Sequence, residues 1–252
     1  MKKATFVPVL LFAFAVGLFA EDAKALLYQI DARRDVPDMA FELKITSFDG
    51  GKAVDWMDLL GSVSLKGDRN RTLVWFADPS SVKGRKMLMD GPVIYLLFPK
   101  TRNPIRLSPL QVLTGQTANG DIARSSFSLE FDPSALERVD YDGRSCWLFT
   151  LTAKEALKSS TYRKVRLWVD ASNLRPIHGE FFTSGDSPLK TIDYADFHEV
   201  GGADVPFLLK ITDVENPNLH TDMQYGQVTS HRVPDSEFRR EYLETWMPEG
   251  IR

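Results

Sequence analysis

Val93-Ile94-Tyr95-Leu96-Leu97-Phe98 is a run of six apolar residues that directly follows the turn Asp90-Gly91-Pro92. Leu73-Val74-Trp75-Phe76 is a second run of this kind, and the segments 86–89 and 146–149 are close to it. An antiparallel sheet usually exposes one face to water, so strands that are apolar on both faces need a cover on each face or a bound apolar ligand. A curved sheet with helices on its concave side would provide either.

Other segments alternate between apolar and polar residues, as half-buried strands do. Phe41, Leu43 and Ile45 alternate with polar residues up to the turn at 49–51. Because strands at this spacing follow one another without intervening helices, the sequence predicts a mainly β (α+β) fold with one antiparallel sheet. The other predicted strands are 54–66, 71–77, 85–90, 93–98, 136–142, 145–153, 162–170, 175–183, 189–197, 205–215 and 219–230.

Three segments favour helices. The i, i+3, i+4, i+7 spacing of an amphipathic helix occurs over 22–34, in Ala23, Leu26, Leu27 and Ile30. Pro37 would stop this helix soon after. Residues 108–127 are interpreted as short helices or a lid-like insertion that crosses the sheet. A last helix is predicted over 235–243, with Asp235 or Ser236 as its N-cap.

The N-terminus has the pattern of a secretory signal peptide. Lys2 and Lys3 precede an apolar run of 14 residues over 6–19, which is short for a membrane span. Cleavage near Ala20 would leave residues 21–252 as a single exported domain, and an uncleaved membrane anchor is the alternative. Loss of the two lysines takes the formal net charge from -3 to -5.

Composition and motifs argue against several classes of function. With 31 basic and 34 acidic residues and no basic block, the chain is not expected to bind nucleic acid. Cys146 is the only cysteine, so an internal disulfide, a zinc finger and a CxxC redox pair are excluded. The four histidines lack metal-binding spacing. The densest cluster of possible metal ligands is Asp193, Asp196, His198 and Glu199, and these side chains cannot all converge from a single strand. No metal and no cofactor are expected.

No catalytic motif has a fitting context. Ser80-x-x-Lys83 matches the pattern of penicillin-interacting serine enzymes, but that chemistry needs the serine at the start of a helix. Here the motif lies in a turn between predicted strands and has no K-T-G companion. The sequence also lacks G-x-S-x-G and G-x-G-x-x-G. We therefore expect a protein that is not an enzyme.

A series of short motifs spans nearly all of residues 40–245 in a fixed order. They are Lys83-Gly84-Arg85-Lys86-Met87-Leu88, Leu97-Phe98-Pro99, Pro104-Ile105-Arg106-Leu107, Leu113-Thr114-Gly115, Gly120-Asp121-Ile122, Tyr162-Arg163-Lys164-Val165, Leu167-Trp168-Val169-Asp170, Leu189-Lys190-Thr191, Val205-Pro206, Thr221, and Val233-Pro234-Asp235 with Phe238 and Leu243. In this order and spacing, the chain resembles the LolA-like family of outer-membrane lipoprotein-sorting proteins.

The resemblance implies a strongly curved antiparallel sheet that forms an incomplete barrel, closed by short helices around an apolar cavity. It also implies a periplasmic carrier that takes acyl chains of lipoproteins, or a phospholipid, from an inner-membrane transporter to an outer-membrane acceptor. Burial of each methylene group contributes about 0.8 kcal/mol, so one long chain could be held without polar chemistry.

Candidate ligand-binding residues follow from the doubly apolar strands. The predicted cavity lining is Trp75, Met87, Met89, Ile94, Leu96, Phe98, Phe149 and Leu167, and the predicted lid is Leu110, Leu113 and Ile122. The alternative is a non-enzymatic periplasmic adaptor or scaffold of an envelope transport complex, with a filled core. Its docking patches would be Trp56, Met57 and the predicted helix around Phe238.

Overall fold

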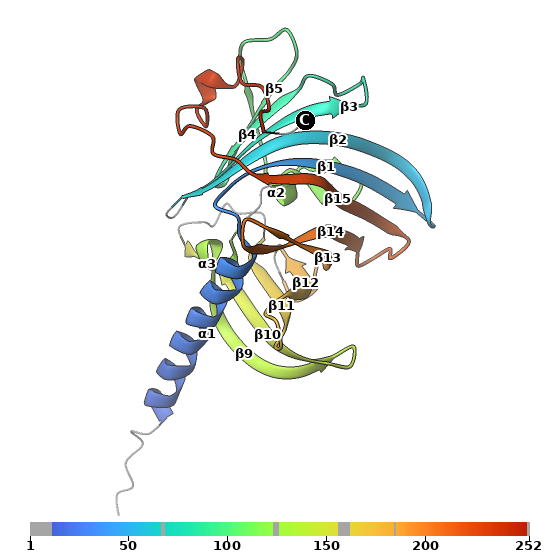
Figure 1. The fold of residues 1–252 in the computed structure, drawn as a ribbon. Helices are drawn as coiled ribbons and strands as arrows, with labels where there is room; N and C mark the ends of the chain where they lie inside the picture. Colours follow the sequence, from blue (N-terminus) through green and yellow to red (C-terminus); the bar gives the residue numbers. More distant parts are fainter. Residues whose placement is uncertain (1–11, 67–68, 123–125, 156–161, 184, 251–252) are drawn as a thin grey trace, which may run out of the picture.

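One antiparallel sheet dominates the protein (Figure 1). The computed structural model describes the following residues: 12–66, 69–122, 126–155, 162–183 and 185–250. Within them the sheet has 13 strands, and helices are few and short apart from the N-terminal one. The predicted mainly β class is confirmed.

The first half of the sheet consists of strands that are neighbours both in sequence and in space. They are β1 (Asp38–Asp49), β2 (Lys52–Lys66), β3 (Arg69–Asp78), β4 (Lys86–Asp90), β5 (Val93–Leu97) and β6 (Ile105–Leu107). Gly50 and Gly51 connect β1 to β2 with φ angles of 55° and 80°, a left-handed conformation that glycine adopts without steric cost.

The second half is built in the same way from the later part of the chain. Its strands are β9 (Phe131–Tyr141), β10 (Arg144–Ala153), β11 (Lys164–Asp170), β12 (Pro176–Phe182), β13 (Lys190–Val200), β14 (Ala203–Asp213) and β15 (Leu219–Ser230). Pairing of β1 with β15 joins the halves and places Leu43 opposite Tyr225. The order is β6-β5-β4-β3-β2-β1-β15-β14-β13-β12-β11-β10-β9, so the sheet is not closed into a barrel.

Three helical elements lie on one face of the curved sheet, which we call the inner face, and α1 meets this face with its C-terminal part (Figure 1). They are α1 (Phe12–Arg34), α2 (Asn119–Ile122) and α3 (Phe127–Glu130), and a small hairpin of β7 (Val112–Thr114) and β8 (Thr117–Ala118) precedes α2. Ala23, Leu27 and Ile30 of α1 are buried in the core, which confirms the predicted amphipathic helix over 22–34. In the described part of the chain, no helix combines the length and apolar character that crossing a bilayer requires.

The doubly apolar strands are covered on both faces. On β3, Val74 packs into the core of the inner face, while its neighbour Leu73 packs into a separate cluster on the opposite, outer face. Successive side chains of a strand point to opposite faces, so this division continues through β4 and β5. Met87 belongs to the inner core and Leu88 to the outer cluster. The runs at 73–76 and 93–97 are therefore apolar because each lies between the inner core and the outer cluster.

The cover of the outer face is the C-terminal segment Val233–Trp246, which we call the strap (Figure 1). The predicted helix over 235–243 is wrong, because only Arg240–Tyr242 form a short 3₁₀ helix there. The apolar anchors of the strap are Val233, Phe238, Leu243 and Trp246. Their spacing of five, five and three residues does not repeat on one face of an α-helix, and an irregular segment can seat all four.

Candidate functional site

The inner face of the sheet brings together most of the predicted cavity-lining residues. Met87, Met89, Ile94, Leu96, Phe149 and Leu167 all belong to the inner core. They come from both halves of the sheet, where Met87 pairs with Leu96 and Phe149 pairs with Leu167. The structure thus places six of the eight residues on one continuous apolar surface.

Two of the predicted lining residues lie elsewhere. Trp75 packs against the outer cluster, because it follows Val74 on β3 and a shift of one residue reverses the face. Phe98 lies just beyond the end of β5 and is 37% exposed, with the Arg85 guanidinium 5.3 Å from its ring centroid. Neither side chain is part of the inner core.

The predicted lid residues divide in a similar way. Ile122 of α2 is buried in the inner core, and Leu113 of β7 packs against that core. Leu110 is 44% exposed and does not take part. The insertion at 108–127 therefore covers the inner face through Leu113 and Ile122, but not through Leu110.

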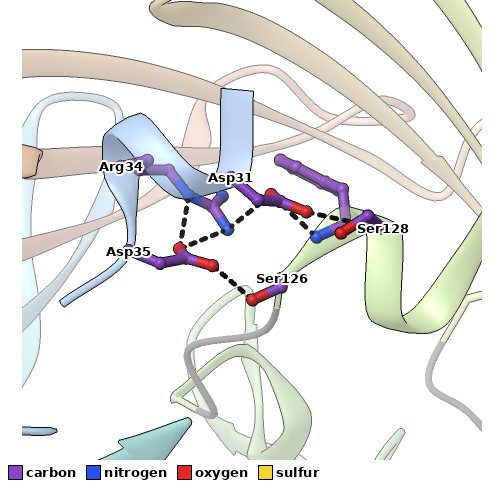
Figure 2. Close-up of polar contacts among 6 residues, drawn as sticks. Asp31, Arg34, Asp35, Ser126 and Ser128 are labelled. Carbon is purple, nitrogen blue, oxygen red and sulfur yellow. Dashed lines mark hydrogen bonds and ion pairs between the residues drawn. The ribbon is translucent and has the colours of Figure 1, made fainter. Parts of the chain in front are cut away.

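A buried ionic network attaches α1 to α3, as Figure 2 shows. The Asp31 carboxylate accepts hydrogen bonds from the backbone N–H groups of Phe127 (3.1 Å) and Ser128 (2.6 Å). Arg34 donates from Nη2 to Asp31 (3.4 Å) and from Nε to Asp35 (3.1 Å). These contacts fix the end of α1 to the start of α3.

Two more contacts complete this network. The Ser126 hydroxyl donates a hydrogen bond to Asp35 (Figure 2). The Arg34 guanidinium also lies 4.7 Å from the centroid of the Phe127 ring. Burial raises the pKa of Asp31, against the lowering effect of Arg34. Burial alone would lower the pKa of Arg34, but the carboxylates of Asp35 and Asp31 raise it overall.

A second buried ion pair attaches α2 to the sheet. Asp121 pairs with Lys190 of β13, and both side chains are less than 5% exposed. Asp121 also accepts hydrogen bonds from the Tyr162 hydroxyl and the Ala118 N–H, each at 2.7 Å. Burial, and then the Asp121 charge, raise the pKa of Tyr162 well above its usual value. Tyr162 therefore stays a neutral donor to this carboxylate.

The ionic network at the end of α1 and the Asp121–Lys190 ion pair flank a pocket of about 100 Å³ between the helices and the inner face. Its walls are Arg34, Gly120, Asp121, Phe127, Glu130, Phe131, Tyr162, Phe181, Ile192, Tyr194, Pro206, Leu209 and Tyr225. Pockets for small-molecule ligands commonly have volumes of roughly 300–1,000 Å³. A long acyl chain would therefore have to displace the helices, starting from a pocket that already has apolar walls and a few charges.

Sequence reasoning missed this ionic network. A signal was available, because Asp31 and Arg34 occupy positions i+4 and i+7 from Leu27 and so continue the apolar stripe of α1. Charged residues on the buried stripe of a helix need buried partners. The partners come from α3, some 95 residues later, and no local pattern indicates them.

The possible metal-ligand cluster at 193–199 and the Ser80-x-x-Lys83 motif lie at the surface. Asp193, Asp196 and His198 have side chains about half exposed. Ser80 and Lys83 lie in the turn between β3 and β4, where Lys83 pairs with Asp78 at 3.6 Å. Within the described residues, no group of three His, Cys, Asp or Glu side chains is arranged to hold a metal ion.

The fold and the site together define a half-barrel protein whose apolar inner face is closed by helices. A LolA superfamily protein from Nitrosomonas europaea has 31% sequence identity to this chain and a TM-score of 0.78, over 88% of this chain and 99% of its own. This chain belongs to the LolA superfamily, which confirms the family resemblance.

Two further solved structures share the fold. A DUF1329 family protein from Desulfovibrio piger has 17% identity and a TM-score of 0.74, over 89% of this chain and 99% of its own. A domain from Vibrio parahaemolyticus named for outer membrane lipoprotein sorting has 16% identity and a TM-score of 0.77, with the same coverage. A family model described as an uncharacterized protein matches residues 68–245. No curated protein matches the sequence of this chain.

Proposed function

We propose that this protein is a periplasmic carrier that binds the acyl chains of a lipoprotein or a phospholipid on the inner face of its sheet and catalyses no reaction. The observation that carries the proposal is the cover of the inner face, which consists of three separate helical elements over a continuous apolar surface. Membership of the LolA superfamily, and the name of the Vibrio parahaemolyticus domain, support the same function.

In this proposal the closed structure is the empty carrier. The helices supply the apolar contacts that an acyl chain would make, so the inner face stays dry between loads. A cargo that binds only the open form shifts the population toward it. Burial of each methylene group contributes about 0.8 kcal/mol, so a long chain can offset the loss of the helical cover.

The lining of the open cavity would be the inner-face residues Met87, Met89, Ile94, Leu96, Phe149 and Leu167, with Leu113 and Ile122 in the lid. Residues 1–20 would be a signal peptide that directs residues 21–252 to the periplasm. There the carrier would take its cargo from an inner-membrane transporter and deliver it to an outer-membrane acceptor. Binding of an acyl chain on an apolar face requires no metal and no cofactor.

Tryptophan fluorescence with brominated lipids tests the proposal. Trp147 packs against the inner core, whereas Trp168 on the neighbouring strand lies in a cluster on the outer face. Two variants of residues 21–252 would each keep one of these tryptophans and carry phenylalanine at the other four positions. Brominated fatty acid or phospholipid should quench Trp147 several-fold more strongly than Trp168.

Equal quenching of both reporters would mean adsorption to the surface and would contradict the proposal. If no lipid bound at all, an adaptor or scaffold with a filled core would be the better reading, and the small volume of the inner pocket favours that alternative. Trp56, 42% exposed, could then contribute to docking. Met57 and Phe238 are each only 4% exposed and cannot, which corrects the predicted docking patches.

A further inference from the structure

A second pocket lies on the opposite side of the sheet from the proposed lipid site. It has a volume of about 550 Å³ and is bounded by the strap and by the outer side of β3, β4 and β5. Its apolar floor comes from Leu88, Val93, Tyr95 and Phe238. Neither the inner core nor the ionic network of α1 contributes to its walls.

Four arginines line this pocket: Arg69 and Arg71 from β3, and Arg239 and Arg240 from the strap. The acidic residues in its walls are Asp90, Asp235 and Glu241. Segments far apart in the sequence thus bring an excess of positive charge to one concave site, in a protein whose formal net charge is -3.

Much of the acidic charge is already paired. Asp235 accepts hydrogen bonds from both Lys66 (3.0 Å) and Arg71 (3.1 Å), and these bonds lower its pKa. Asp90 pairs with Arg69 at 3.7 Å. Within the described part of the chain, Arg239 and Arg240 have no carboxylate within 4 Å, and both are exposed on the strap.

Arg71 is 7% exposed, an unusual position for a guanidinium group. It lies over the Phe238 ring, 4.8 Å from the ring centroid, and its Nη2 donates to Asp235. Its buried Nε has no hydrogen-bond acceptor among the residues that the structure describes. Buried donors are nearly always paired, so a donor left unpaired beside a pocket indicates a missing acceptor.

We propose that this pocket binds a phosphate group, either as free phosphate or a soluble phosphate ester, or as the headgroup of a phospholipid. Arginine suits this role because its planar group of N–H donors matches phosphate oxygens. A tetrahedral anion can accept from several directions, and here arginines from the sheet and from the strap line one pocket. The aromatic and apolar floor leaves room for the group that carries the phosphate.

The test uses isothermal titration calorimetry of residues 21–252 with inorganic phosphate and with glycerol 3-phosphate, and flotation with vesicles of neutral lipid with and without phosphatidic acid. The main variant is R239Q/R240Q, whose exposed side chains should not be needed for folding. Its matched control is R102Q, since the Arg102 side chain is 88% exposed and lies outside this pocket. A second variant, R71K, keeps the charge at the buried position but removes the planar donor group.

We expect saturable binding that R239Q/R240Q weakens at least tenfold, that R71K also weakens, and that R102Q leaves unchanged. Binding of glycerol 3-phosphate would indicate a soluble ligand, whereas binding only to vesicles with phosphatidic acid would indicate a headgroup. Absence of binding in every arm, or equal weakening by R102Q and R239Q/R240Q, would overturn the proposal. Brominated-lipid quenching of Trp147 reports on the inner face alone, so it tests the two sites separately.

Discussion

The substitution Leu27→Ala tests whether α1 leaves the inner face when cargo binds or is a fixed part of the core. Leu27 on α1 is fully buried against the inner face, and the equally buried Leu73 on β3 packs under the strap on the outer face. Removing a buried leucine side chain usually costs about 2–5 kcal/mol of folding stability. Both substitutions should therefore lower the free energy of unfolding by similar amounts in urea denaturation.

Their effects on lipid binding should differ. If α1 leaves the inner face when cargo enters, Leu27→Ala destabilises only the closed form and raises the fraction of open protein. A loss of about 3 kcal/mol corresponds to roughly a 100-fold larger open fraction, and apparent affinity rises by the same factor while the open form stays minor. Leu73→Ala weakens closed and open forms alike, so affinity should not change.

The assay is titration with a naturally fluorescent polyene fatty acid, at a temperature where urea denaturation shows both variants to be folded. The expected result is tighter binding by Leu27→Ala and parental affinity in Leu73→Ala. Parental affinity in Leu27→Ala, despite its lost stability, would show that α1 is a fixed part of the core. Equal tightening in both variants would show only that destabilised protein binds apolar probes.

Three other substitutions test separate features of the fold. Gly61→Ala should lower the free energy of unfolding by about 1–3 kcal/mol, because the added Cβ would lie 2.3 Å from the Phe41 ring. An unchanged midpoint of urea denaturation would contradict this packing. Asp31→Ala should cost about 3–5 kcal/mol, since it leaves Arg34 without one of its buried carboxylate partners, and Asp31→Asn, which keeps an acceptor oxygen, should cost less. Burial raises the pKa of Tyr194, so above about pH 10 the unfolded chain loses a proton that the folded chain keeps, and stability falls by up to about 1.4 kcal/mol per pH unit. Tyr194→Phe should make this alkaline loss shallower in denaturation series near pH 10, and an unchanged slope would exclude Tyr194 as a source.

Most of the sheet could be predicted from the sequence because its signals are local. Alternation and turn residues located the long strands, and the apolar stripe of 22–34 located the part of α1 that packs on the sheet. The short strand β6 and the β7–β8 hairpin have only two or three residues each, too few for a period to be recognised. The strap is not a helix because its four apolar anchors pack on another part of the fold, and this packing decides its conformation.

The candidate site was predicted less completely. Periodicity separates the two faces of a strand but does not say which face is concave, so Trp75 was grouped with residues such as Met87 that point the other way. The ionic groups depend on contacts across the chain, such as Asp121 with Lys190. Such contacts follow from how the sheet curves, and no window of neighbouring residues contains that information.

The two covers of the sheet are chemically different, and in the proposed carrier this difference favours opening of the inner face. The strap holds the outer face through apolar anchors such as Phe238 and Leu243, and its ion pairs with the sheet run through Asp235, whose side chain is 63% exposed, so lifting it would expose mainly apolar surface to water. The inner cover combines apolar contacts with buried charges, Asp31 and Arg34 on α1 and Asp121 on α2. Water solvates such charges strongly when they are released, and this offsets part of the ion-pair energy lost on opening. If the protein is the proposed carrier, opening should therefore begin at the helices on the inner face, and the apolar surface beneath them would receive the acyl chain.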